Sequence, residues 1–170
     1  LQITDQCYVI NSFSKYFSMT GWRVGWMVVP EDHVRQIERL AQNMFICAPH
    51  ASQIAALYAM DCKDELKSNM SVYKENRKLM IKGLKEAGFS KISSPDGAFY
   101  IYADINKFCN DSLGFANKVL EDAKVAITPG LDFDPKNGHS TIRFSYARST
   151  EDIIRGLDKL NIFMKNNKYI

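Results

Sequence analysis

Cysteine is scarce in this sequence, and the patterns that would make its cysteines structural are missing. The four cysteines among 170 residues include no Cys-x-x-Cys pair, and the three histidines are scattered. This spacing favours reduced, buried thiols and gives no indication of a disulfide framework or a metal site. Reduced thiols are typical of the cytoplasm, where we expect the protein to be located.

Long apolar runs and blocks of like charge are also absent. No run reaches the roughly 18 apolar residues that a membrane-spanning helix needs, so we expect no membrane association. The 22 basic and 19 acidic residues are spread along the chain and leave a net charge of +3. No segment has the basic density of a nucleic-acid-binding arm, so we expect no nucleic-acid partner. The composition is that of one globular domain, or one and a half.

What the sequence does contain is a group of reactive and anion-binding residues near its start. The motif Ser12-Phe13-Ser14-Lys15 follows an apolar, strand-like run at 7–10, and Arg23 follows between two glycines. A lysine amine can form a Schiff base with a carbonyl, and small hydroxyls with a guanidinium can bind a phosphate. These are the parts needed to hold a phosphorylated aldehyde. Taken singly, the same residues also fit a solvated loop lysine, turn serines and a strand-end arginine.

The segment resembles the lysine motif of the class I/II aminotransferases, which are fold-type I enzymes that depend on pyridoxal 5′-phosphate (PLP). Further segments are similar to other motifs of that family and follow in the family's order: 46–53, Pro95–Tyr100, Ile127–Gly130 and Ile142–Ala147. The stretch Met19–Trp26 looks most like the aspartate and aromatic aminotransferase branch. The resemblance extends over the whole chain.

The resemblance implies a role for each site residue. Lys15 would be the catalytic residue, which holds PLP as a Schiff base and then moves a proton between the substrate α-carbon and the cofactor. Ser12, Ser14 and Arg23 would bind the cofactor phosphate. Arg143 would bind the substrate α-carboxylate through two parallel hydrogen bonds.

The implied activity is the transfer of an amino group between an amino acid, of the aspartate or aromatic type, and a 2-oxo acid, by a homodimer. Two other readings stay open because nothing in the chain excludes them. One is a PLP-dependent C–S lyase or aminocyclopropane-carboxylate synthase-like enzyme, and the other is an aminotransferase-like ligand-sensing domain of a regulator. The family lysine lies past the middle of a much longer chain, so we expect a C-terminal fragment that is inactive alone and lacks the residues that hold the cofactor ring.

The hydrophobic periodicity predicts a mixed α/β fold. Strands are predicted at 6–12, 24–29, 98–103, 125–128 and 141–146, the first of them buried. Helices are predicted at 31–45, 51–62, 64–87, 113–122 and from a capping box at Ser149 to about residue 165. Phe99, Tyr100 and Tyr102 are predicted to be core residues of their strand, and Arg148 to be structural.

The resemblance divides these elements between two domains. Residues 1–62 would be the C-terminal end of the large PLP-binding domain, including the lysine loop. Residues 63–170 would be the small α/β C-terminal domain, with a long helix bridging the two. Only two strands of the large-domain sheet fall within this chain, and strands without partners expose their edges. We therefore expect the isolated chain to order poorly before about residue 60, or to dimerise there.

Overall fold

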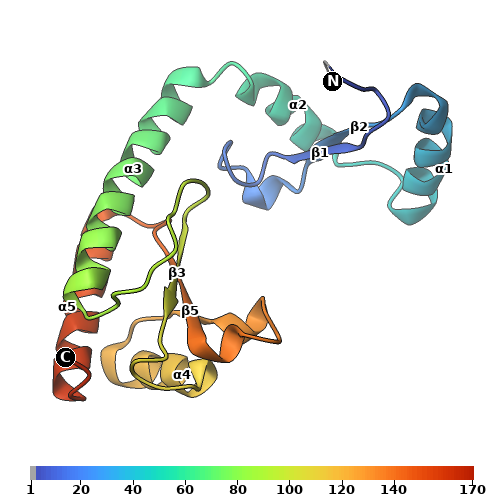
Figure 1. Ribbon diagram of the computed structural model, residues 1–170. Coiled ribbons are helices and arrows are strands. Elements are labelled where there is room, and N and C mark those ends of the chain that lie inside the picture. Colours follow the sequence, from blue (N-terminus) through green and yellow to red (C-terminus); the bar gives the residue numbers. More distant parts are fainter. Residues whose placement is uncertain (1–2) are drawn as a thin grey trace. The chain divides into compact units, whose positions relative to one another are not determined.

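The computed structural model describes residues 3–170, which form the mixed α/β fold predicted from the sequence. The chain divides into two compact units, one that ends at Ser68 and one that comprises Asn69–Ile170. Figure 1 shows their helices and strands, coloured from blue near the N-terminus to red at the C-terminus. No helix within residues 3–170 is both long enough and apolar enough to cross a membrane.

The first unit contains a two-stranded antiparallel sheet, in which Ser12 lies opposite Gly25. Its strands are β1 (Val9–Ser12) and β2 (Gly25–Val28). Both predicted strands are present, but the prediction that the first is buried is wrong, since β1 is exposed along its whole length. Its apolar residues indicate a need for burial, whereas among the described residues β2 is its only strand neighbour. The buried core of this unit is correspondingly small and consists of Phe13, Met19 and Ala56.

Two helices follow the sheet of the first unit. A single 3-10 turn at Glu31–His33 leads into α1 (Val34–Met44), which falls within the predicted helix 31–45. Pro49 precedes α2 (His50–Ala59), where its fixed φ and missing N–H suit the entry to a helix. None of the residues of α1 is buried in this chain.

The second unit is built on a three-stranded antiparallel sheet in the order β3–β5–β4. Its strands are β3 (Tyr100–Asp104), β4 (Thr128–Pro129) and β5 (Thr141–Ser145). The prediction of a strand at 125–128 is wrong except for its last residue. Val125 and Ile127 pack against the core without joining the ladder, so their apolar character reflects burial and not strand pairing.

Alternation along β3 and β5 gives the sheet two different faces. One face is apolar and buried, and it carries Ile101, Ala103, Ile142 and Phe144. The other face carries Tyr100, Tyr102 and Arg143, all half-buried. The prediction that Tyr100 and Tyr102 are core residues is therefore wrong, because the residues that alternate with them occupy the core face. Arg143 lies on the central strand, opposite Tyr102 of β3 and Thr128 of β4.

The second unit has three α-helices, and residues typical of helix ends are found after the first and before the last. They are α3 (Lys63–Glu86), which contains the boundary between the two units, α4 (Ser112–Ala123) and α5 (Thr150–Asn166). Gly88 follows α3 with φ of 89°, the left-handed conformation that ends helices. The Ser149 side chain accepts a hydrogen bond from the Asp152 N–H at 3.2 Å, which confirms the predicted cap of α5.

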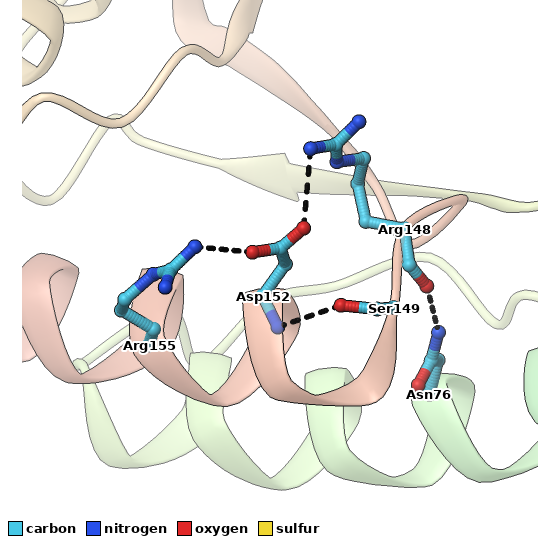
Figure 2. A network of polar contacts seen from close by, with 5 residues as sticks. All are labelled: Asn76, Arg148, Ser149, Asp152 and Arg155. Carbon is cyan, nitrogen blue, oxygen red and sulfur yellow. Dashed lines mark hydrogen bonds and ion pairs between the residues drawn. The ribbon is translucent and has the colours of Figure 1, made fainter.

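Asn76, a buried asparagine of α3, binds the segment between β5 and α5, and Figure 2 shows its hydrogen bond to Arg148. The Asn76 side-chain amide donates to the carbonyls of Tyr146 at 3.2 Å and Arg148 at 2.7 Å. The Thr150 hydroxyl donates to the Asn76 carbonyl oxygen at 2.9 Å. These bonds fix the segment that leaves β5, the strand that carries Arg143. The Arg148 guanidinium pairs with Asp152 of α5 at 3.1 Å, and its structural role stays a prediction.

Candidate functional site

The loop between β1 and β2 is held closed by Phe13, which lies between the two serines. Its N–H donates to the Val24 carbonyl at 3.2 Å, and its own carbonyl accepts from the Met19 N–H at 3.1 Å. The Phe13 ring is buried and packs against the rings of Phe17 and Trp26, with centroids 4.6 and 5.1 Å away. An apolar anchor inside the loop therefore leaves the polar residues on either side of it for the surface.

Ser12, Ser14 and Arg23 are joined by one chain of hydrogen bonds. The Ser12 hydroxyl accepts from the Ser14 N–H at 3.0 Å, and the Thr20 hydroxyl donates to the Ser14 carbonyl at 2.6 Å. The Arg23 guanidinium then donates to the Thr20 carbonyl at 2.8 Å. Each group keeps capacity for an external anion, because a hydroxyl can donate its own proton and a guanidinium carries five N–H donors.

Lys15 is exposed and lies within the same loop, directly after Ser14. Its carbonyl accepts from the Ser18 N–H at 3.0 Å, so the lysine begins a tight turn. Ser18 and Arg23 have φ of 56° and 52°, a left-handed conformation that is uncommon for residues other than glycine. The structure therefore places an amine, two hydroxyls and a guanidinium on one short, closely bonded loop.

The two glycines around Arg23 differ in what they contribute. A Cβ at Gly25 would lie 2.5 Å from the Asn11 carbonyl oxygen, so only glycine fits where β2 meets β1. Nothing lies within 4 Å of a Cβ at Gly21, and packing does not explain the glycine there. The steric requirement at Gly25 keeps β2 close to β1, directly opposite Ser12.

Arg143 has no counter-ion among residues 3–170. Its Nε is buried and has no hydrogen-bond partner among residues 3–170. The ion pairs of the described residues include Arg148 and Arg155, both with Asp152, but not Arg143. A buried guanidinium nitrogen normally has a partner, because leaving one unpaired is costly. The position is therefore suited to an anion supplied from outside the second unit.

The rings of Tyr100 and Phe133 contact the Arg143 guanidinium. Its central carbon lies 4.1 Å from the ring centroid of Tyr100 and 3.9 Å from that of Phe133, both within cation–π range. Sequence reasoning missed both residues. Alternation with Ile101 could have placed Tyr100 on the arginine face, but no local pattern marks Phe133, which meets Arg143 only through the folding of the chain between them.

The predicted site residues fall into two groups. Ser12, Ser14, Lys15 and Arg23 lie together on the loop of the first unit, and Arg143 lies on β5 of the second.

The model of the aminotransferase class I and II family matches residues 2–160, and the chain therefore belongs to that family. A crystal structure from Silicibacter pomeroyi is 67% identical with a TM-score of 0.93, and the match covers 97% of this chain and 45% of that one. An aminotransferase structure from Mycobacterium tuberculosis is 42% identical with a TM-score of 0.93, over 97% of this chain and 43% of that one.

Relatives with assigned names point to the same class. The valine–pyruvate aminotransferase of Mycobacterium tuberculosis is 42% identical over 165 residues, which are 96% of this chain and 42% of that protein. A probable aspartate aminotransferase of Methanocaldococcus jannaschii is 37% identical over 164 residues, 92% of this chain and 42% of that protein. The chain thus spans less than half the length of the curated relatives that it matches, and the family predicted from its motifs is confirmed.

Proposed function

We propose that the protein containing this chain is a PLP-dependent aminotransferase, which transfers an amino group between an amino acid of the aspartate or aromatic type and a 2-oxo acid. The observation that carries the proposal is the loop at residues 12–23, where an amine, two hydroxyls and a guanidinium share one bonded scaffold. Membership of the family supports the reaction class. The relatives' names, which include valine–pyruvate and aspartate aminotransferase, support an amino acid and a 2-oxo acid as substrates.

The donors of the loop fit the phosphate of PLP. The hydroxyls of Ser12 and Ser14 and the guanidinium of Arg23 would bind a dianion, and the exposed position of all but the half-buried Ser14 leaves them accessible. When bound, PLP supplies an aldehyde that takes up the amino group and a ring that accepts electrons from the substrate α-carbon. The Lys15 amine would hold the aldehyde between turnovers and move a proton at the α-carbon during them.

Arg143 would bind the substrate α-carboxylate. Two parallel N–H···O bonds match a guanidinium to a carboxylate, and no carboxylate of the described residues forms an ion pair with this guanidinium. Every amino acid and 2-oxo acid in the reaction carries that carboxylate, so one arginine would serve both halves of the exchange. We propose that the 170 residues alone, which span about 42% of the length of the curated relatives, are inactive.

We assign residues 1–62 to the end of a large PLP-binding domain and residues 63–170 to a small C-terminal domain. The boundary between the two compact units inside α3 supports this division. We also infer a homodimer, in which the last residue of α1 and the segment after it contact the partner subunit. Exposed apolar residues there support it: Met44 is 77% exposed, Phe45 61% and Ile46 79%. The four cysteines are unpaired, which is consistent with a cytoplasmic location, but none of them is buried, so the prediction of buried thiols is wrong.

The test is transamination by the whole protein and by its Lys15→Ala variant. We expect the wild type to convert amino acids only when a 2-oxo acid acceptor is present, and the variant to lose nearly all of that turnover. Lys159→Ala, an exposed lysine on α5, is the matched control and should keep full activity. Acceptor-independent release of pyruvate would instead indicate the C–S lyase reading. Wild-type turnover in Lys15→Ala would refute the proposal.

A further inference from the structure

We propose that Phe133 and Tyr100 are positioning residues, which fix the plane of the Arg143 guanidinium so that one edge of it receives the substrate carboxylate. The inference rests on the proposed function and extends it to two residues with no reactive group. Two-point binding of a carboxylate requires the guanidinium and the carboxylate to share a plane. A guanidinium on a flexible side chain must therefore be held from its faces or from its own hydrogen bonds.

No hydrogen bond within residues 3–170 holds the Nε of this guanidinium. Arg143 Nε is buried and unpartnered within residues 3–170, and Arg143 forms no ion pair there. Two rings do contact it, that of Tyr100 at 4.1 Å and that of Phe133 at 3.9 Å. An aromatic face attracts a guanidinium and stacks on it without using any of its N–H donors. The rings can therefore orient the group and leave its donors for a ligand.

The Tyr100 ring is set by the sheet. Tyr100 begins β3 and lies opposite Ser145 of β5, two residues along from the pair formed by Tyr102 and Arg143. Residues two apart on a strand share a face, so Tyr100 and Arg143 are diagonal neighbours on the side of the sheet away from the core. The ring also contacts that of Phe99, with centroids 4.2 Å apart.

The Phe133 ring lies on a compact loop that is closed by backbone hydrogen bonds. The N–H groups of Phe133 and Asp134 both donate to the Gly130 carbonyl at 2.9 Å. A Cβ at Gly130 would lie 2.6 Å from the Gly138 carbonyl oxygen, so two turns of the loop are in backbone contact. The Phe133 ring also packs against the Tyr102 ring in a T-shaped arrangement, with centroids 6.3 Å apart.

Asp134 closes the same loop just after Phe133. Its carboxylate accepts from the N–H groups of Asn137 at 3.0 Å and Lys136 at 2.9 Å. These hydrogen bonds, of which the one from Asn137 has the largest effect, hold the pKa of the Asp134 carboxyl below its usual value of 3.8. The bonded carboxylate form is therefore present at neutral pH. The phenylalanine is thus carried on a closed scaffold although its side chain is 48% exposed.

Exposure of Phe133 makes the inference testable, because removing a half-exposed ring costs the core little. In the whole protein, Phe133→Leu keeps an apolar side chain and removes the ring. We expect it to raise KM about tenfold for the amino donor and for the 2-oxo acid alike, with kcat and PLP content little changed. Phe133→Tyr restores a ring and should restore KM. Leu131→Ala, at a 40% exposed residue of the same loop, is the control that should leave KM unchanged.

A double variant separates positioning from general damage to the loop. Lysine cannot present the planar fork of arginine, so adding Phe133→Leu to Arg143→Lys should cause no further rise in KM. The positioning role alone would be overturned if Phe133→Leu raised KM equally in the wild-type and Arg143→Lys proteins. It would also be overturned if Phe133→Leu kept the wild-type KM while the wild type transaminated normally. Absence of acceptor-dependent transamination in the wild type would overturn the proposed function and this inference with it.

Discussion

The arginines near the end of β5 differ in whether their guanidinium groups have a partner. Arg148 and Arg155 share Asp152 as an ion-pair partner, whereas the buried Nε of Arg143 has no partner in the part of the chain that the structure describes. Surface pairs such as that of Arg148 contribute only about 0–1 kcal/mol. Arg143, whose buried Nε is unpartnered within residues 3–170, is the arginine that we assign to the substrate, and this assignment gives a direct test.

Arg143→Ala in the whole protein is expected to raise KM about 100-fold for several amino donors together, because all of them share the α-carboxylate. Steady-state kinetics with an acidic, an aliphatic and an aromatic donor would measure this. Arg148→Ala is the matched control, since it also removes an arginine near the end of β5, and it should leave KM unchanged. An increase confined to one donor would argue that Arg143 contacts a side chain and not the shared carboxylate.

The elements were predictable where local chemistry decides them. Capping at Ser149 and the left-handed Gly88 mark helix ends in the sequence, and α3 and α5 form close to their predicted bounds. Burial of β1 and pairing of residues 125–127 were mispredicted, because apolar composition does not say which neighbour covers a residue.

The candidate site was predictable to a similar extent. The residues of the lysine loop are close in sequence, and the loop joins Ser12, Ser14 and Arg23 through hydrogen bonds. The ring of Phe133 over Arg143 depends on a loop between two strands, and nothing in the local sequence encodes that contact. Local motifs therefore predicted the candidate reactive groups, whereas the contacts of Tyr100 and Phe133 with Arg143 were visible only in the structure.

The connection between β5 and α5 depends on Asn76, which makes three side-chain hydrogen bonds in a buried position. Asn76→Ala would leave the carbonyls of Tyr146 and Arg148 without their donor. We expect it to lower the free energy of unfolding of the second unit by about 2–3 kcal/mol. Denaturant unfolding followed by circular dichroism would measure this change. Lys78→Ala, on the surface of the same helix, should change it by less than about 0.5 kcal/mol, and an equal effect of the two would contradict the role of Asn76.

The same connection predicts a loss of stability at high pH. Burial raises the pKa of the Tyr146 hydroxyl above its usual 10.0, against a smaller opposite effect of Arg77, and the hydroxyl donates to the Ala98 carbonyl at 3.1 Å. Because the folded pKa is the higher one, this contribution is complete below pH 10.0 and is lost as pH rises from there through the folded pKa.

Tyr146→Phe should therefore flatten the fall in stability above pH 10.0 and cost about 1 kcal/mol at neutral pH, where only the hydrogen bond is lost. Denaturant midpoints of wild type and variant, compared on either side of that pH, would show the difference. Parallel curves for the two proteins across this range would mean that Tyr146 does not contribute to the pH dependence.

At the scale of the whole molecule, the two units are unequally stabilised by their own residues. The core of the second unit draws on α3, α4, α5 and the buried face of the sheet. Among the described residues of the first unit, the core cluster has three buried residues, Phe13, Met19 and Ala56, with a few partly buried neighbours. Apolar side chains of the first unit remain exposed, among them Ile10 at 76% and Leu57 at 66%. Such surfaces are normally covered by further protein.

We therefore expect a polypeptide of residues 63–170 to unfold in one cooperative transition, and one of residues 1–62 to show none. Circular dichroism would follow the first. Both tryptophans, Trp22 and Trp26, lie within residues 1–62, so their fluorescence reports directly on that polypeptide. A sharp, cooperative fluorescence transition in 1–62 would show that the lysine loop is stable without further protein, contrary to this account.

If Lys15 is the amine that holds the cofactor, as we propose, covalent mapping will identify it. The whole protein would be incubated with PLP, reduced with borohydride, digested and analysed by mass spectrometry. A single stoichiometric label on the peptide that contains Lys15, absent from the Lys15→Ala variant, is the result that we predict. A label on another lysine, or one spread over many surface lysines with Lys15 unmodified, would contradict the claim.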